Sequence, residues 1–201
     1  MSSVVLSGDT SGTVTLTVPA VAGTNTVTVP AGTGTMAVQG VSTNIVSGTA
    51  VASTSGTAID FTSIPSWVKR ITVMFSGVSL SGTSTYLLQL GAGSTTTTGY
   101  TAYYSIQENS GTAIVYSSTS GFPVFENNAA NLRYGTAKFV NISGNTWVCD
   151  GLFVGTSSSA VSAYMTTGGS IALSGTLDRI RITTANGTDT FDAGSINILY
   201  E

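Results

Sequence analysis

The sequence predicts an all-β protein, with a thin N-terminal β-repeat stalk followed by an antiparallel β-sandwich of the jelly-roll type. Val, Ile, Tyr and Phe alternate with Thr and Ser along much of the 201-residue chain, which is the pattern of half-buried strands. Turns rich in Gly, Ser and Asn separate these stretches at short intervals. No segment keeps a helical period of 3.6 residues, so helices are not expected to form a layer of the fold.

The N-terminal domain, residues 1–40, is built on an eleven-residue repeat. Residues 11–23 read SGTVTLTVPAVAG, and residues 22–34 read AGTNTVTVPAGTG. Each copy is a short alternating strand followed by Pro-Ala and a Gly turn. Such a narrow unit cannot bury its own apolar side chains, so it needs stacked copies or copies from other chains. We therefore expect a homotrimer, in which each chain covers an apolar face of another.

A Ser-, Thr- and Gly-rich connector, residues 41–57, precedes the second domain, residues 58–201. Residues 69–79 are its clearest strand, because Ile71, Val73 and Phe75 fall on one face. A helical turn could begin at the proline of the SIPSW segment that follows the first strand. The alternation predicts strands at 58–61, 69–79, 85–90, 98–107, 113–116, 122–125, 133–142, 146–154, 160–166, 177–184 and 195–200. Short antiparallel strands at such spacing are typical of a sandwich or jelly roll.

The low charge of the chain excludes several classes of partner. Only 7% of residues are charged, and the formal net charge is −3. Without a basic run, nucleic acid and anionic membranes are not expected to bind. No apolar run approaches the roughly 18 residues of a membrane-spanning helix, and MSSVVLSGDTSG at the start does not resemble a signal peptide. These features predict synthesis in a cytoplasm and no membrane insertion.

The chain contains no histidine, which excludes Ser-His-Asp and Cys-His catalysis and nearly all zinc and iron sites. It shows no nucleotide-binding motif in a βαβ context, so neither an enzyme nor a cofactor is expected. A polysaccharide depolymerase would need two converging carboxylates, and Glu108 with Glu126 is the pair that could supply them. We expect these two acids to be solvated turn residues instead.

Two other sites have both a chemical and a structural interpretation. Asp189 and Asp192 follow Asn186-Gly187 and could bind Ca²⁺ weakly, but turn acids that accept hydrogen bonds from backbone N–H groups are the favoured interpretation. Cys149, the single cysteine, alternates with Trp147 and Phe153 and is expected to be a buried apolar residue.

Acidic and basic residues also occur together at 178–181. Asp178 lies next to Arg179 and near Arg181. Counting with a period of two puts neighbouring side chains on opposite faces of a strand. We therefore expect both arginines to pair across strands or subunits rather than with Asp178.

Tyrosines are concentrated in the middle of the second domain. Exposed tyrosines beside Ser- and Asn-rich loops are suited to stacking on sugar rings, so this region is the expected receptor contact. For any single ring, a place in the core or in a subunit interface is the more common alternative. The candidate receptor contacts are Tyr100, Tyr103, Tyr104, Glu108 and Tyr116.

The chain resembles phage and prophage fibre proteins in two places. The opening LSGDTSGTVTLTVPAVAGTNTVTVPAGTGTMAV is similar to a repeat near the start of many phage fibre or appendage proteins. The phrases SWVKRITVMFSGVS and TDTFDAGSIN are similar to the C-terminal module of prophage tail-fibre-like proteins. The resemblance implies a trimeric virion appendage, anchored to other virion proteins by its N-terminal segment and carrying its β-domain distally. The residues expected to mediate this attachment are Val14, Leu16, Val18, Val27 and Val29.

The sequence therefore leads to a non-enzymatic trimeric phage fibre whose distal β-domain contacts a host surface, with a glycan as the expected receptor. A capsid decoration or cement protein, or a head fibre without receptor binding, is the alternative. The two differ in attachment, because a fibre docks through residues 1–40 whereas a cement protein spreads its β-domain over the capsid.

Overall fold

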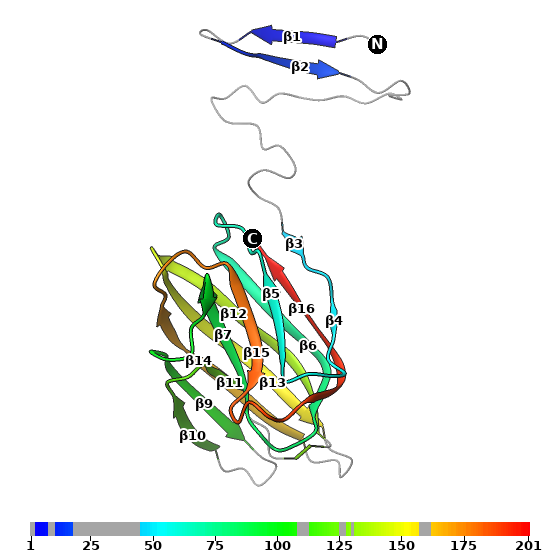
Figure 1. The fold of residues 1–201 in the computed structure, drawn as a ribbon, viewed down its shortest axis with the longest axis vertical. Coiled ribbons are helices and arrows are strands. Elements are labelled where there is room, and N and C mark those ends of the chain that lie inside the picture. The colour runs from blue at the N-terminus through cyan, green and yellow to red at the C-terminus, as the bar shows by residue number, and fades with distance from the viewer. Residues whose placement is uncertain are drawn as a thin grey trace. The chain divides into compact units, whose positions relative to one another are not determined.

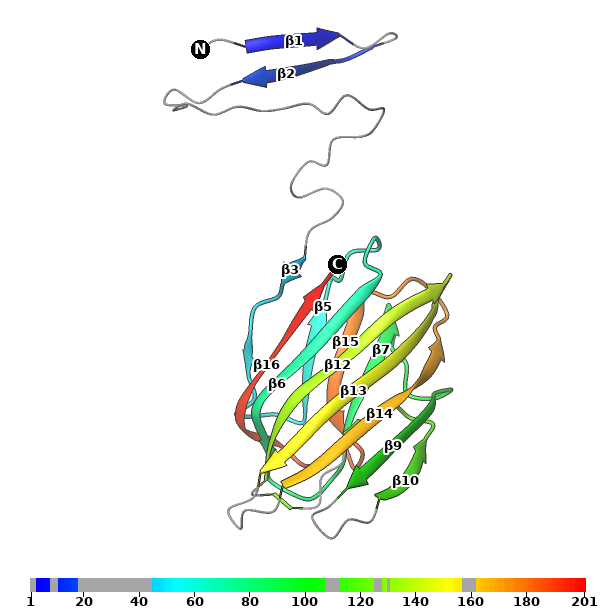
Figure 2. The ribbon, with the colours of Figure 1, turned by 180° about the vertical axis from the view of Figure 1, so that it is seen from behind.

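The computed structural model describes residues 3–7, 11–17, 45–107, 113–124, 128–129, 131–156 and 162–201. All regular structure in these residues is β-strand, and the strands pair antiparallel (Figures 1 and 2). The chain separates into two compact units, Met1–Ala37 and Val38–Glu201. An all-β fold was predicted from the alternation of β-branched and aromatic residues with Ser and Thr, and the structure confirms it.

The first unit contains a β-hairpin. Strand β1 (Ser3–Ser7) pairs antiparallel with β2 (Thr13–Thr17), which lies in the first copy of the repeat. Val5 and Leu6 of β1 are 54% and 56% exposed. The second copy of the repeat lies outside the described residues. Within the described residues, the hairpin therefore leaves apolar side chains in solvent, and an isolated strand pair of this kind is only marginally stable.

The second unit is a sandwich of two antiparallel sheets, which face each other in Figures 1 and 2. The larger sheet has nine strands, in the order β10-β9-β14-β13-β12-β6-β16-β3, with β4 also paired to β16. The smaller sheet has five, in the order β11-β7-β15-β5, with β8 also paired to β7. The strands are β3 (Val46–Ser47), β4 (Val51–Ala52), β5 (Ala58–Thr62), β6 (Arg70–Leu80), β7 (Tyr86–Ala92), β8 (Ser94–Thr95), β9 (Thr101–Gln107), β10 (Ala113–Ser118), β11 (Phe122–Val124), β12 (Leu132–Ser143), β13 (Thr146–Thr156), β14 (Ser162–Ala172), β15 (Arg179–Thr184) and β16 (Phe191–Tyr200).

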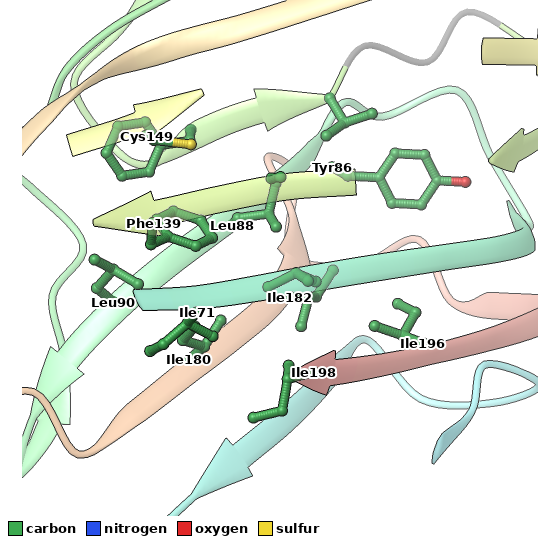
Figure 3. Close-up of a cluster of buried hydrophobic side chains, with 14 of the residues drawn as sticks. Ile71, Tyr86, Leu88, Leu90, Phe139, Cys149, Ile180, Ile182, Ile196 and Ile198 are labelled. Atoms are coloured by element: carbon green, nitrogen blue, oxygen red, sulfur yellow. The ribbon is translucent and has the colours of Figure 1, made fainter. Parts of the chain in front are cut away.

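Apolar side chains from the facing surfaces of the two sheets form the core. Figure 3 shows Leu88 and Ile182 of the smaller sheet among Ile71 and Phe139 of the larger one, and all four are fully buried. Burial alternates along β15 and along the first half of β6, because successive side chains point to opposite faces. Strand β7 is buried on both faces over its first six residues.

Cys149 lies in this core at 6% exposure, so the prediction of a small buried apolar residue is confirmed. Burial and the nearby Asp150 carboxylate raise the pKa of its thiol well above the ordinary range. The thiol therefore stays protonated and unreactive at neutral pH.

One local expectation is confirmed and another needs correction. Pro65 begins a single turn, as expected, in which its carbonyl accepts a hydrogen bond from the Val68 N–H. Arg181 pairs across strands with Asp60, as expected, but Arg179 pairs with the adjacent Asp178. The period-two rule did not apply to Asp178, because β15 begins at Arg179.

Candidate receptor-binding surface

The candidate surface lies at the end of the larger sheet that is formed by β9 and β10. These strands pair antiparallel, and β9 also pairs with β14. Figure 2 shows β10 at the margin of the sheet, followed by β9, β14 and β13. Ala102 and Ile106 of β9 point into the core, whereas Thr101 and Tyr103 are exposed on the outer face. The alternation thus divides the tyrosines of this region between two faces.

Tyr104 and Tyr116 form a stacked pair on the inner face. They occupy directly opposed positions on β9 and β10, with ring centroids 5.2 Å apart and ring planes at 25°. Tyr104 packs against the core, while Tyr116 is 41% exposed. Burial, and secondarily the Tyr116 hydroxyl, raises the pKa of Tyr104. Tyr104 supports Tyr116, and the exposed edge of Tyr116 is the part that a ligand could reach.

Tyr103 is the most accessible of the four predicted tyrosines, at 56% exposure. Its neighbour in register on β14 is Gly168, and the next residue across the sheet is Asp150 of β13. The Asp150 carboxylate lies 3.5 Å from the Lys138 ammonium, and both side chains are solvent-accessible. The Asp150 position is two strands away from Tyr103, or about 10 Å. Between them lies Gly168, which has no side chain, so the surface between the Tyr103 ring and the ion pair is formed by backbone alone.

A second exposed tyrosine, Tyr164 of β14, extends this outer face. It is also 56% exposed, and it lies opposite Gln107 of β9. Between the rows of Tyr103 and Tyr164, the Ser105 and Thr166 hydroxyls share a hydrogen bond of 2.8 Å. The two tyrosines are four residues apart in register, or about 13 Å at 3.3 Å per residue. Aromatic rings, hydroxyls and an ion pair thus share the outer face of the sheet. Such a face could stack on apolar sugar faces and form hydrogen bonds with sugar hydroxyls.

Tyr164 and Asp150 were not among the predicted contacts. Period-two alternation puts them on the opposite face of their strands from Met165 and Cys149. That β14 lies beside β9 is set by tertiary pairing between distant segments, which no local pattern indicates.

Tyr100, in contrast, is not a surface residue, and its expected receptor contact is corrected to a core role. It is 2% exposed. Its hydroxyl accepts a hydrogen bond of 2.9 Å from the Leu90 N–H and donates one of 2.9 Å to the Thr96 carbonyl. Burial raises its pKa to about 12. The ring also packs edge-on against Phe122.

Several other predicted residues lie outside the described part of the chain. These are Glu108, Glu126 and the attachment residues Val18, Val27 and Val29. Val14 and Leu16 occupy β2, where their backbones pair with Leu6 and Val4 of β1.

Asp189 and Asp192 both accept hydrogen bonds within the fold, but only Asp189 does so from a backbone N–H, as the turn-acid interpretation predicts, since Asp192 lies in β16. Asp189 accepts from the Ser84 N–H at 2.9 Å and from the Asn186 side-chain amide at 2.8 Å. Asp192 accepts from the Ser79 hydroxyl. Within the described ranges, no three Cys, Asp or Glu side chains come together as metal ligands.

Profiles of known protein families, curated proteins and solved structures gave no match to this chain. Among the residues that the structure describes, no helix is long and apolar enough to span a bilayer.

Proposed function

We propose that the protein is a structural component of a phage virion, a homotrimeric fibre that attaches through residues 1–40 and binds a host-surface glycan with its jelly-roll-like β-sandwich. The outer-face surface formed by Tyr103, Gly168 and Asp150 is the observation that carries the binding role. Because Gly168 beside the exposed Tyr103 ring has no side chain, a sugar ring has room to stack on that ring. The carboxylate and ammonium beyond it supply hydrogen-bond partners.

The trimeric, attached form is supported by the N-terminal unit and by the resemblance of its repeat to phage fibre proteins. Val5 and Leu6 are more than half exposed in the single chain, and burial against neighbouring chains would stabilise the assembly. Three copies of a weak sugar site on one trimer would raise the overall affinity through avidity. The protein in this proposal acts by binding, without catalysis or cofactor.

The binding role can be tested with full-length protein on a panel of immobilised bacterial surface polysaccharides. We expect at least one polysaccharide to be bound, and Tyr103→Ala to weaken that binding at least tenfold without changing the melting temperature. Tyr134→Ala is the matched control, since Tyr134 is a 41% exposed tyrosine on β12 of the same sheet. Equal binding by wild type and Tyr103→Ala would reject the surface, and no binding to any polysaccharide would reject a glycan receptor.

A capsid decoration protein without receptor binding is the second candidate, and the apolar part of the outer sheet face favours it. Leu152 of β13 is 53% exposed and Ile142 of β12 is 62% exposed, and such residues could spread over a capsid surface. Val14→Asp and Leu16→Asp should abolish particle association of a fibre, whereas Leu152→Asp should abolish that of a decoration protein. Electron microscopy of particles carrying the labelled variants separates the two.

A further inference from the structure

Strand β10 is an exposed edge of the nine-stranded sheet. In the described part of the chain it pairs with β9 and with no other strand. Its apolar residues Ile114, Val115 and Tyr116 are 49%, 67% and 41% exposed. The strand sequence, AIVYSS, contains no charge, proline or glycine. An edge of this kind offers a row of backbone N–H and C=O groups to any added strand.

The other edges of the sandwich carry the features that discourage such pairing. In the smaller sheet, β11 is three residues long and contains Pro123, and β5 contains Asp60 in an ion pair with Arg181. At the opposite end of the larger sheet, β3 and β4 are two residues each. Short strands, proline and charge all hinder edge-to-edge association. Strand β10 has six residues and none of these features.

A second copy of β10 is the occupant that these residues fit. The chain has a net charge of −3, so two copies repel weakly overall, but β10 itself brings no charge to the contact. Two identical antiparallel strands are related by a two-fold axis perpendicular to the sheet. This symmetry keeps inner-face residues opposite inner-face residues. Residues on one face of β10 are either all even-numbered or all odd-numbered. Two residues that face each other across the contact must therefore both be even or both be odd, and this condition excludes every second register.

Among the allowed registers, one matches the apolar side chains best. With Val115 on the axis, it faces the Val115 of the second copy, and Ile114 of each copy faces Tyr116 of the other. Aromatic and β-branched residues form favourable cross-strand pairs. With Tyr116 on the axis, Ile114 and Val115 would instead face Ser118 and Ser117. The first register is therefore preferred.

We propose that two copies of this protein associate through antiparallel β10–β10 pairing centred on Val115, which joins their nine-stranded sheets into one. This contact is two-fold and belongs to the sandwich. It is therefore distinct from the threefold contact proposed for residues 1–40, and the two can fail independently: loss of the two-fold contact halves the assembly mass, whereas loss of the threefold contact divides it by three.

Cysteine cross-linking tests the register directly. In full-length Val115→Cys, the new thiols of two copies would face each other on the axis. We expect oxidised glutathione to convert most of the protein to a covalent dimer at micromolar concentration. Ser117→Cys is the matched control, because Ser117 is an exposed residue on the same face of β10 but would face Ala113. The buried Cys149 does not contribute to the background. Equal cross-linking of the two variants would overturn the proposed register.

A charge on the axis tests the contact without any cross-link. Val115→Lys would place two like charges directly opposite each other, while Val115 is exposed enough to tolerate lysine in the single chain. We expect sedimentation analysis to give a mass half that of wild type, with an unchanged circular dichroism spectrum. An equal mass for wild type and Val115→Lys would show that β10 is not a contact between copies.

Discussion

Arg179 binds the carboxylate of its neighbour in sequence, Asp178, through two hydrogen bonds. The distances are 2.8 Å from Nε to Oδ1 and 3.2 Å from Nη2 to Oδ2. Asp178 Oδ1 also accepts a hydrogen bond of 3.1 Å from the Gly93 N–H. The pair thus connects the start of β15 to the turn after β7, and it places a charged group where β7 ends and β15 begins. Both side chains are partly exposed, Asp178 at 39% and Arg179 at 28%.

This pair predicts a specific acid sensitivity. The hydrogen bond from Arg179 lowers the pKa of Asp178 below its ordinary value of 3.8. A carboxyl whose folded-state pKa is depressed contributes stability above its unfolded pKa and loses it as the pH falls through the folded value. Asp178→Asn should therefore cost less than about 1 kcal/mol at pH 7, as for other exposed pairs, and progressively less as the pH falls below about 4, the pKa of an unfolded Asp. Urea unfolding over this pH range measures the difference, and a cost independent of pH would contradict it.

Tyr100 and Tyr103 provide a matched pair for hydroxyl deletion. Tyr100→Phe removes an acceptor for the buried Leu90 N–H and a donor to the Thr96 carbonyl, so we expect a cost of about 1–3 kcal/mol. The Tyr103 side chain is mostly in solvent, and Tyr103→Phe should change the free energy of unfolding by less than about 0.5 kcal/mol. Urea denaturation of both variants tests this, and similar midpoints would contradict the different roles of the two residues.

The buried thiol of Cys149 should report on global unfolding. At 6% exposure and with a strongly raised pKa, it should react with a thiol reagent such as DTNB only when the sandwich opens. The labelling rate should therefore rise with urea in parallel with the loss of β-sheet circular dichroism. Fast labelling in native buffer would indicate local opening around β13.

The sandwich strands could be predicted because their residues alternate. Strand β6 was predicted at 69–79 and is observed at Arg70–Leu80, and β13 was predicted at 146–154 and is observed at Thr146–Thr156. The two-residue strands β3 and β4 were not predicted, since they form only where β16 offers backbone partners. Two residues are too few to show a period.

The candidate surface was only partly predictable for the same reason. Alternation separates Tyr103 from Tyr104, and the structure places them on opposite faces. Whether a given face is covered depends on how far the second sheet extends, and local sequence does not contain that information. Tyr100 lies just before β9, in phase with the buried Ala102 and Ile106, but alternation alone does not show which phase faces the core. Its burial is seen in its contacts with Leu90 of β7 and with Phe122. Gly168 lies beside Tyr103, and Asp150 lies beside Gly168, because strands far apart in the sequence pair with each other.

Gly168 and Gly169 of β14 give the last prediction, because the same substitution at adjacent positions should have very different costs. A Cβ at Gly169 would lie 2.0 Å from the Thr101 carbonyl oxygen of β9, and the residue has a φ of +149°. Gly169→Ala must therefore push β9 away from β14, and we expect a loss of about 3 kcal/mol or more. A Cβ at Gly168 would meet its nearest atom, the Cys149 carbonyl oxygen, at an ordinary 3.4 Å.

Gly168→Ala is therefore the control, with an expected change below about 1 kcal/mol. Thermal and urea unfolding of both variants measures the costs. Gly169 pairs with Ala102, the residue before Tyr103 on β9, so Gly169→Ala should also weaken binding at the candidate surface by displacing β9. Gly168→Ala is a control for stability only, because Gly168 is itself part of that surface. If both variants unfold at the wild-type midpoint, the close β9–β14 approach at Thr101 is wrong. If Gly169→Ala is destabilised but binds polysaccharide as well as wild type, the binding surface does not depend on the placement of β9.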